Sequence, residues 1–241
     1  MINEFIINVP EEQLSDLHNS IKHTRWPDEI NDQYWSHGTK MSFLKDLSKY
    51  WVDEFNWKDQ EKKINDIGSF KFKTNSGLSI HFLHAKSNHK DAVPLVMTHG
   101  WPGSIQEFIK IIPIIQKESK IPVDIICPSL PGFGFSDKPK STGMNSKEIA
   151  KLQHELVMAL EYKKYVVQGG DWGATVSKWM AELFPEHCIG IHLNLVIAFP
   201  PNTENPMEGV TNKELKLLEN FNKYKHKVMV TMKYIKQSHK L

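Results

Sequence analysis

The sequence predicts an α/β fold with a mostly parallel, doubly wound sheet. Three short β-rich runs, at residues 93–100, 123–132 and 165–171, alternate with segments in which apolar residues recur at helical spacing, as in successive strand–helix–strand units. Stretches within these runs, such as "PLVM" and "YVVQ", lack polar alternation, which is typical of strands covered by helices on both faces. The 241 residues suffice for one sizeable domain of this class, alone or with an appendage.

The segment before the sheet is predicted to be mainly helical. Residues 10–26 begin with a proline and two glutamates and then place apolar residues at helical spacing. Residues 41–57 form a second amphipathic pattern whose apolar face carries Phe43, Leu44, Leu47, Tyr50, Trp51 and Phe55. We expect this stripe to be core, because burying each large ring contributes about 2 kcal/mol. Residues 69–86 alternate around a turn at 75–77 and predict a β-hairpin.

The later elements continue the α/β alternation. Residues 145–161 and 174–186 predict helices, and residues 188–196 predict a further strand. From residue 198 the sheet pattern stops, and a loop rich in proline, asparagine and glycine leads to a polar helix at 212–227.

Composition excludes several classes of protein. The formal net charge of +2 is too small to favour nucleic acid or an anionic membrane surface as the main partner. The two cysteines, Cys127 and Cys188, lack the spacing of a zinc site or a disulfide framework and are predicted to be small apolar residues in or near strands. No signal peptide and no apolar run of membrane-spanning length is present, so we expect no membrane anchor and a cytoplasmic location.

The segment "GGDWG" at residues 169–173 is the strongest pointer to chemistry. It matches the pattern glycine–any residue–nucleophile–any residue–glycine between a strand and a helix, with Asp171 in the nucleophile position. Glycines are needed because the strained turn leaves no room for side chains beside the nucleophile. The turn also places Asp171 at a helix N-terminus, where the dipole favours an anion. A tight glycine turn with a helix-capping aspartate is the structural alternative.

Two other segments favour the catalytic interpretation. The run 93–100 leads into a second sharp turn, "HGWPG" at residues 99–103. The backbone N–H of Trp101 in this turn and that of Trp172 are expected to converge beside Asp171 as an oxyanion hole. The loop "PSLPGFGFSDKP", at residues 128–139, is expected to line the same rim.

The segments "HGWPGSIQEF", "PSLPGFGFSDKP" and "GGDWGA" resemble, in order and spacing, those of the epoxide hydrolases of the α/β-hydrolase fold. The N-terminal segments "TRWPDE", "YWVDEFNWKDQEKKIN" and "IHFLHAK" are similar to those of the microsomal-type branch, and the resemblance runs from about Phe5 to about Lys227. It divides the chain into a family-type N-terminal segment at 1–110, an overlapping and incomplete α/β-hydrolase core at 70–198, and the start of a lid at 199–241 with an atypical tail from 228.

The resemblance implies specific site residues. Asp171 would be the nucleophile, and the backbone N–H groups of Trp101 and Trp172 would form the oxyanion hole. The supporting motif residues would be His99, Gly100, Pro102, Gly169, Gly170 and Gly173. The implied partner is a small-molecule epoxide, with no cofactor and no metal. His81 and His84, three apart in a strand, point to opposite faces and cannot share a metal ion.

The implied reaction converts an epoxide and water to a vicinal diol. The carboxylate opens the epoxide to give an enzyme ester, and a His–acid pair then activates water. In this fold the acid and the histidine follow the nucleophile along the chain, and we expect both to lie beyond residue 241. None of the twelve histidines stands in an equivalent position. The family resemblance ends at Lys227, so we expect the sequence to stop within the lid, through a frameshift, a split gene or a fragmentary assembly.

Two alternatives stay open. One is a haloalkane or haloacid dehalogenase of the same fold, in which Asp171 and Trp172 would also serve. The other is a non-catalytic remnant, because we expect this chain alone to turn over little or no substrate. The oligomeric state and the identity of the epoxide are not predicted.

Overall fold

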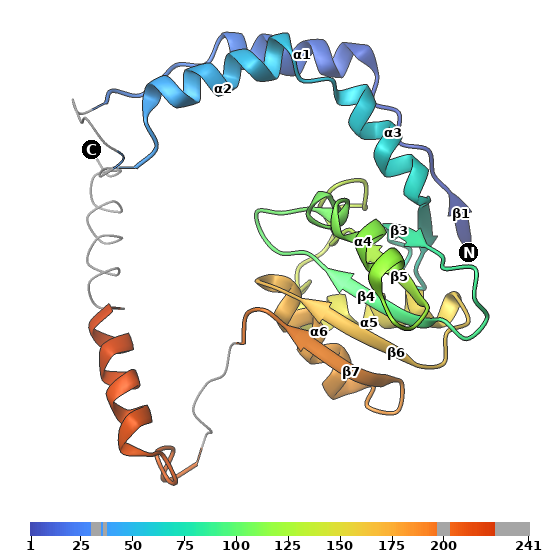
Figure 1. Ribbon diagram of the computed structural model, residues 1–241, viewed down its shortest axis with the longest axis vertical. Helices are drawn as coiled ribbons and strands as arrows, with labels where there is room; N and C mark the ends of the chain where they lie inside the picture. The colour runs from blue at the N-terminus through green and yellow to red at the C-terminus, as the bar shows by residue number, and fades with distance from the viewer. Residues whose placement is uncertain (30–34, 36–37, 197–202, 225–241) are drawn as a thin grey trace. The chain divides into compact units, whose positions relative to one another are not determined.

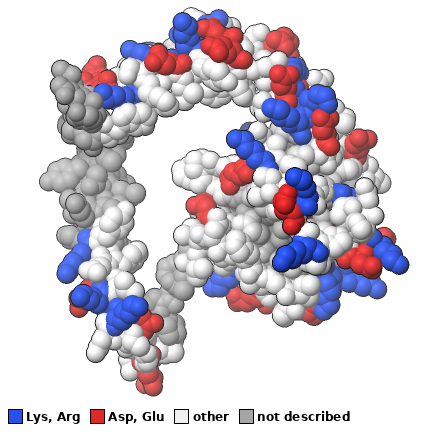
Figure 2. All heavy atoms as spheres, viewed as in Figure 1, with Lys and Arg blue, Asp and Glu red and all other residues white. Residues whose placement is uncertain are grey.

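The computed structural model describes residues 1–29, 35, 38–196 and 203–224 (Figure 1). The chain divides into two compact units, residues 1–197 and 198–241. Across the described ranges, no helix combines the length and the apolar character needed to cross a membrane. On the face drawn in Figure 2, acidic and basic side chains are interspersed, in keeping with a net charge of +2.

The described part of the first unit is built on a seven-stranded sheet with the order β1-β2-β3-β5-β4-β6-β7. Four neighbouring strands are parallel: β4 (Val93–Thr98), β5 (Val123–Pro128), β6 (Tyr165–Gly169) and β7 (Cys188–Leu193). The other three pair antiparallel, with β3 joined to β5: β1 (Ile2–Glu4), β2 (Ser69–Lys73) and β3 (Ser79–Ala85). The predicted α/β class, core strands and hairpin are confirmed, whereas no sequence pattern predicts β1.

Helices cover both faces of this sheet, as Figure 1 shows. One face carries α5 (Ser146–Ala159) and α6 (Trp172–Leu183), and the other carries α3 (Trp57–Ile67), the 3₁₀ helix η2 (Ile105–Phe108) and α4 (Ile111–Glu118). Side chains of β5 alternate between the two cores: Ile125 and Cys127 pack with α4, and Ile126 packs with α5 and α6. Both faces of the sheet are therefore packed against helices through apolar contacts, as strands without polar alternation predict.

Of the two predicted N-terminal helices, one is confirmed and the other is shorter than predicted. The first, α1 (Glu11–Lys22), is confirmed. The second, α2 (Met41–Asp53), ends before residue 57, because the Asn56 side chain accepts the Asp59 N–H and so begins α3 as a separate helix.

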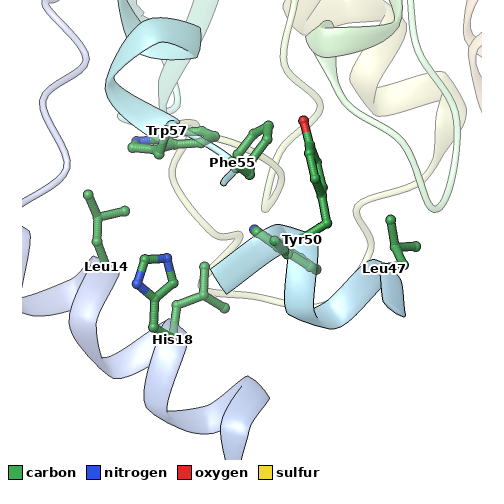
Figure 3. Close-up of a pocket in the computed structure, with 8 residues that line it drawn as sticks. Leu14, His18, Leu47, Tyr50, Phe55 and Trp57 are labelled. Atoms are coloured by element: carbon green, nitrogen blue, oxygen red, sulfur yellow. The ribbon is translucent and has the colours of Figure 1, made fainter. Parts of the chain in front are cut away.

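The prediction that the apolar stripe of α2 is core is wrong for the described residues. No residue of α2 is buried, and Tyr50 and Trp51 are 48% and 44% exposed. The helix α2 contacts α1, and the part of the stripe from Leu47 to Phe55 lines an open apolar cavity of about 310 Å³, which Leu14 and Trp57 also line (Figure 3).

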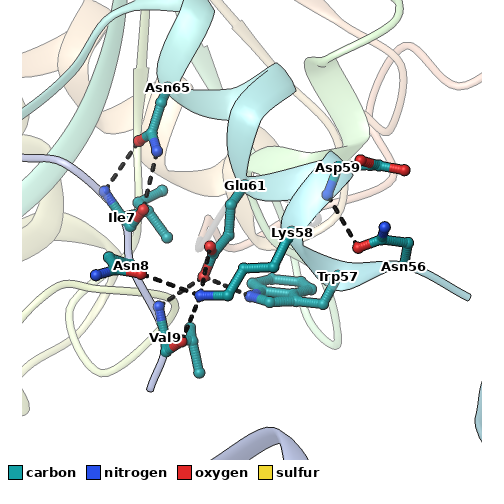
Figure 4. A network of polar contacts seen from close by, with 9 residues as sticks. All are labelled: Ile7, Asn8, Val9, Asn56, Trp57, Lys58, Asp59, Glu61 and Asn65. Carbon is teal, nitrogen blue, oxygen red and sulfur yellow. Dashed lines mark hydrogen bonds and ion pairs between the residues drawn. The ribbon is translucent and has the colours of Figure 1, made fainter. Parts of the chain in front are cut away.

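A buried carboxylate fastens the N-terminal segment to α3 (Figure 4). Glu61 is 5% exposed, and its Oε1 accepts the Val9 N–H at 2.6 Å and the Trp57 Nε1–H at 2.7 Å. Its Oε2 lies 3.0 Å from Lys58 Nζ. Burial alone would raise the pKa of Glu61, but the hydrogen bonds from Val9, Lys58 and Trp57 together hold that pKa below its ordinary value.

We expect Glu61→Ala to lower the free energy of unfolding by about 2 kcal/mol, because it leaves buried donors without partners. The folded-state pKa is lowered, so this stability is present above the ordinary carboxyl pKa and is lost as the pH falls through the folded-state value. Urea denaturation at about pH 7 and about pH 3 should show the loss shrinking on acidification. Lys63→Ala, an exposed position on the same helix, is the control. An equal loss at both pH values would contradict this account.

In the second unit, residues 212–224 form the predicted helix. Thr211 and Glu214 form a capping box: the Thr211 N–H donates to Glu214 Oε2 at 2.8 Å, and the Glu214 N–H donates to Thr211 Oγ1 at 3.3 Å. The atypical tail from 228 and the predicted lid residues 199–202 lie outside the described residues.

Candidate active site

The turn between β6 and α6 presents Asp171 in an unusual backbone conformation. Its φ of 50° and ψ of −127° are rare for any residue other than glycine. Although Asp171 occupies the N-cap position of α6, its side chain makes no capping hydrogen bond. The alternative of a helix-capping aspartate is therefore excluded, and the strained turn directs the carboxylate away from its own helix.

The surrounding glycines are explained by close backbone contacts. A Cβ atom at Gly173 would overlap the carbonyl oxygen of Thr98, and one at Gly169 would overlap that of Gly173. A Cβ atom at Gly100 would come within 2.5 Å of the Asp171 Cβ and Oδ1 atoms. The two glycine turns, which follow β4 and β6, thus meet at Asp171.

The carboxylate is held by one backbone amide and is otherwise open. The Trp101 N–H donates to Asp171 Oδ1 at 2.7 Å. Among the described residues, none makes a hydrogen bond to Oδ2, and the Asp171 residue is exposed. Trp172 is the first residue of α6, where backbone N–H groups have no acceptor within the helix. The structure therefore brings Trp101 and Asp171 together. The residue after Asp171, Trp172, has a backbone N–H with no acceptor within the helix.

A relay of two hydroxyls, which the sequence does not reveal, ties α5 to the first turn of α6. Thr175 Oγ1 donates to the Trp172 carbonyl oxygen at 2.7 Å, and Ser146 Oγ lies 2.8 Å from Thr175 Oγ1. Because the hydroxyl hydrogen of Thr175 is already used, Ser146 must be the donor to Thr175. The relay holds the carbonyl of Trp172, the residue that follows Asp171.

A cavity of about 450 Å³ lies between the two tryptophans of the site. Its apolar lining consists of Trp101, Leu130, Pro131, Phe133, Pro139, Met144, Ile149, Trp172 and Val176. Its two polar lining side chains are engaged by the protein: Asn145 Oδ1 accepts the N–H groups of Lys147 and Glu148, and Ser146 belongs to the relay. The loop 128–139, which the sequence predicts to line the rim of the site, supplies one wall of this cavity.

His99 is buried behind the turn that carries Trp101. It is 1% exposed, its Nε2 accepts the Leu130 N–H at 3.1 Å, and its Nδ1 lies 3.0 Å from the Gly100 carbonyl oxygen. Burial lowers the pKa of His99, although the hydrogen bond to Gly100 and the charge of Glu107 act in the opposite direction. Both ring nitrogens are occupied, so His99 is not a free base for a bound substrate.

Other titratable groups that the sequence singles out lie in structural networks. His81 contacts the hydroxyls of Ser69 and Ser129, while His84 contacts that of Tyr162. The two histidines lie in different networks, and burial lowers the pKa of each to about 4. Within the described ranges no group of three potential metal ligands occurs. Both cysteines are free.

Comparisons with known proteins agree with this geometry. Residues 2–108 match the family model described as "Epoxide hydrolase N terminus", and residues 93–218 match the α/β-hydrolase fold model. A putative epoxide hydrolase of Stigmatella aurantiaca is 42% identical over 83% of this chain and 46% of its own length. Epoxide hydrolase 1 of Sus scrofa is 34% identical over 92% of this chain and 53% of its own.

Solved structures give the same result. The juvenile hormone epoxide hydrolase of Bombyx mori superposes with a TM-score of 0.74 at 36% identity, covering 81% of this chain and 53% of that one. The Aspergillus niger epoxide hydrolase superposes with a TM-score of 0.77 at 29% identity, covering 89% and 56%. The chain thus spans about half the length of the curated relatives it matches. With the aspartate elbow and the two glycine turns in place, the chain belongs to the epoxide hydrolase family and has the α/β-hydrolase fold.

Proposed function

We propose that Asp171 is a nucleophile that opens epoxides. The observation that carries this proposal is the exposed carboxylate, held at Oδ1 by the amide of Trp101, whose residue also lines the apolar cavity together with Trp172, the residue after Asp171. Oδ2, which has no hydrogen bond from the described residues, would attack a ring carbon. The C–O bond to the ring oxygen breaks, and that oxygen takes a proton from an acid or from water. The product is a hydroxyalkyl ester of Asp171.

The same geometry suits hydrolysis of that ester. Oδ1 would become the ester carbonyl oxygen, and it already lies 2.7 Å from the Trp101 nitrogen. When water attacks the carbonyl carbon, negative charge develops on Oδ1, where the N–H groups of Trp101 and Trp172 would stabilise it. The second step also needs a general base, and His99 is unsuited because both of its ring nitrogens are engaged. We therefore expect this chain to form the ester faster than it hydrolyses it.

The cavity favours an epoxide with an apolar limb. Its lining is almost wholly hydrophobic, and its polar side chains are already bonded within the protein. A polar limb would lose hydrogen bonds to water without replacement, which is unfavourable. The named relatives are epoxide hydrolases, which favours this reaction over dehalogenation.

Incubation with styrene oxide, followed by intact mass spectrometry and diol analysis, tests the proposal. We expect the protein to gain the mass of one epoxide, with at most a trace of diol. An unmodified protein with no diol would contradict the nucleophilic role. Steady diol production would leave that role standing and contradict the expected accumulation of the ester.

A further inference from the structure

His99 connects two segments that serve different parts of the proposed site. Its Nδ1 faces the carbonyl of Gly100, in the turn that presents the Trp101 amide to Asp171. Its Nε2 accepts the N–H of Leu130, in the loop that forms one wall of the cavity. Its ring also contacts Phe133, another residue of this wall, at a centroid distance of 5.6 Å and with the rings edge to face.

The partners of the ring define its protonation state. The Leu130 N–H can only donate, so Nε2 must carry a lone pair, and the Gly100 carbonyl can only accept, so Nδ1 must carry the hydrogen. His99 is therefore a neutral imidazole in the Nδ1–H tautomer. A side chain that cannot both donate on one side and accept on the other would release one of the two segments.

We infer that His99 is a positioning residue, which sets the distance between the nucleophile turn and the Leu130–Phe133 wall of the cavity. This inference rests on the proposed function of Asp171. The nucleophile and the wall belong to separate loops, which follow β6 and β5, and the Trp101 turn follows β4. The His99 ring joins the wall to the Trp101 turn, and the Trp101 N–H holds Oδ1 of Asp171, so the ring sets where the limb of an epoxide lies relative to Oδ2 through that turn. An epoxide that fills the cavity depends on this distance, whereas one too small to reach the wall depends on it much less.

Labelling kinetics with two epoxides test the inference. For His99→Leu, we expect the rate constant for labelling by styrene oxide to fall about ten-fold, because a displacement of about 1 Å can cost more than this. The rate with propylene oxide, which has only a methyl limb, should fall much less. His99→Gln retains an acceptor for the Leu130 N–H and should recover most of the styrene oxide rate. The control is His154→Leu, which removes another histidine ring, a partly buried one bonded to Tyr165 and stacked on Phe184, and should leave the ratio of the two rates unchanged.

Equal losses with both epoxides, measured at equal folded fraction, would overturn the inference, as would a His99→Gln variant no better than His99→Leu. If the wild-type chain is not labelled at all, the proposed function fails, and nuclear magnetic resonance then decides the inference separately. We expect ¹⁵N spectra of the imidazole to show the Nδ1–H tautomer, and His99→Leu to shift the amide signals of Leu130, Phe133 and Trp101, with wild-type shifts largely restored in His99→Gln. An Nε2–H tautomer, or unchanged amide signals, would overturn it.

Discussion

Replacement of Asp171 by asparagine is expected to abolish labelling of the protein by an epoxide. Asparagine keeps the shape of the side chain and an oxygen that can accept the Trp101 N–H, but it lacks the charged oxygen that attacks carbon. Removing a nucleophile typically costs at least about a thousand-fold in rate. The measurement is the fraction of protein that gains one epoxide mass over time, for wild type and variant at the same concentration of styrene oxide.

Two controls make this result specific. Asp66→Asn neutralises another exposed carboxylate, which pairs with Lys62 on α3, and it should be labelled at the wild-type rate. Thermal melting should show that Asp171→Asn is folded, because the substitution removes no buried contact. Labelling of Asp171→Asn at the wild-type rate would mean that the epoxide reacts elsewhere.

Gly173→Ala is expected to have the largest effect on stability. The added Cβ would overlap the carbonyl oxygen of Thr98 and come within 2.9 Å of that of His99. Both obstacles are backbone atoms at the end of β4, an interior strand of the sheet, so neither can rotate away. We expect the free energy of unfolding to fall by about 3 kcal/mol, the upper end of the usual cost of overpacking.

A second glycine-to-alanine change provides the matched control. At Gly190, in β7, an added Cβ would meet only the side chain of Val166, at 3.5 Å, which is an ordinary van der Waals distance. Gly190→Ala should therefore leave the urea midpoint nearly unchanged. Similar losses for the two variants would show that close approach at Gly173 is not what requires glycine there.

Much of the fold can be predicted from the sequence because its signals are local. Continuous apolar runs predict the parallel strands, and the 3.6-residue period predicts α5 and α6. The missed elements lack such signals. The three residues of β1 form a strand through pairing with β2, and α4, with the sequence "IIPIIQKE", is too uniformly apolar in its first half to show a helical period.

The candidate site is only partly visible in the sequence. The glycines around Asp171 indicate the strand–turn–helix elbow, because only a crowded turn needs them. The roles of His99 and Thr175 could not be predicted, because each depends on an atom from a distant segment, Leu130 for His99 and Ser146 for Thr175. The exposed stripe of α2 shows the opposite error: its pattern is amphipathic, but the described part of the chain does not enclose it.

Locating the adduct within the chain tests the central claim most directly. Trypsin is expected to release residues 165–178, "YVVQGGDWGATVSK", in which Asp171 is the single carboxylate and no cysteine or histidine occurs. After treatment with styrene oxide, tandem mass spectrometry should place the added mass on Asp171 of this peptide. An unmodified 165–178 peptide, with the added mass on other peptides or absent, would contradict the claim that Asp171 is the nucleophile.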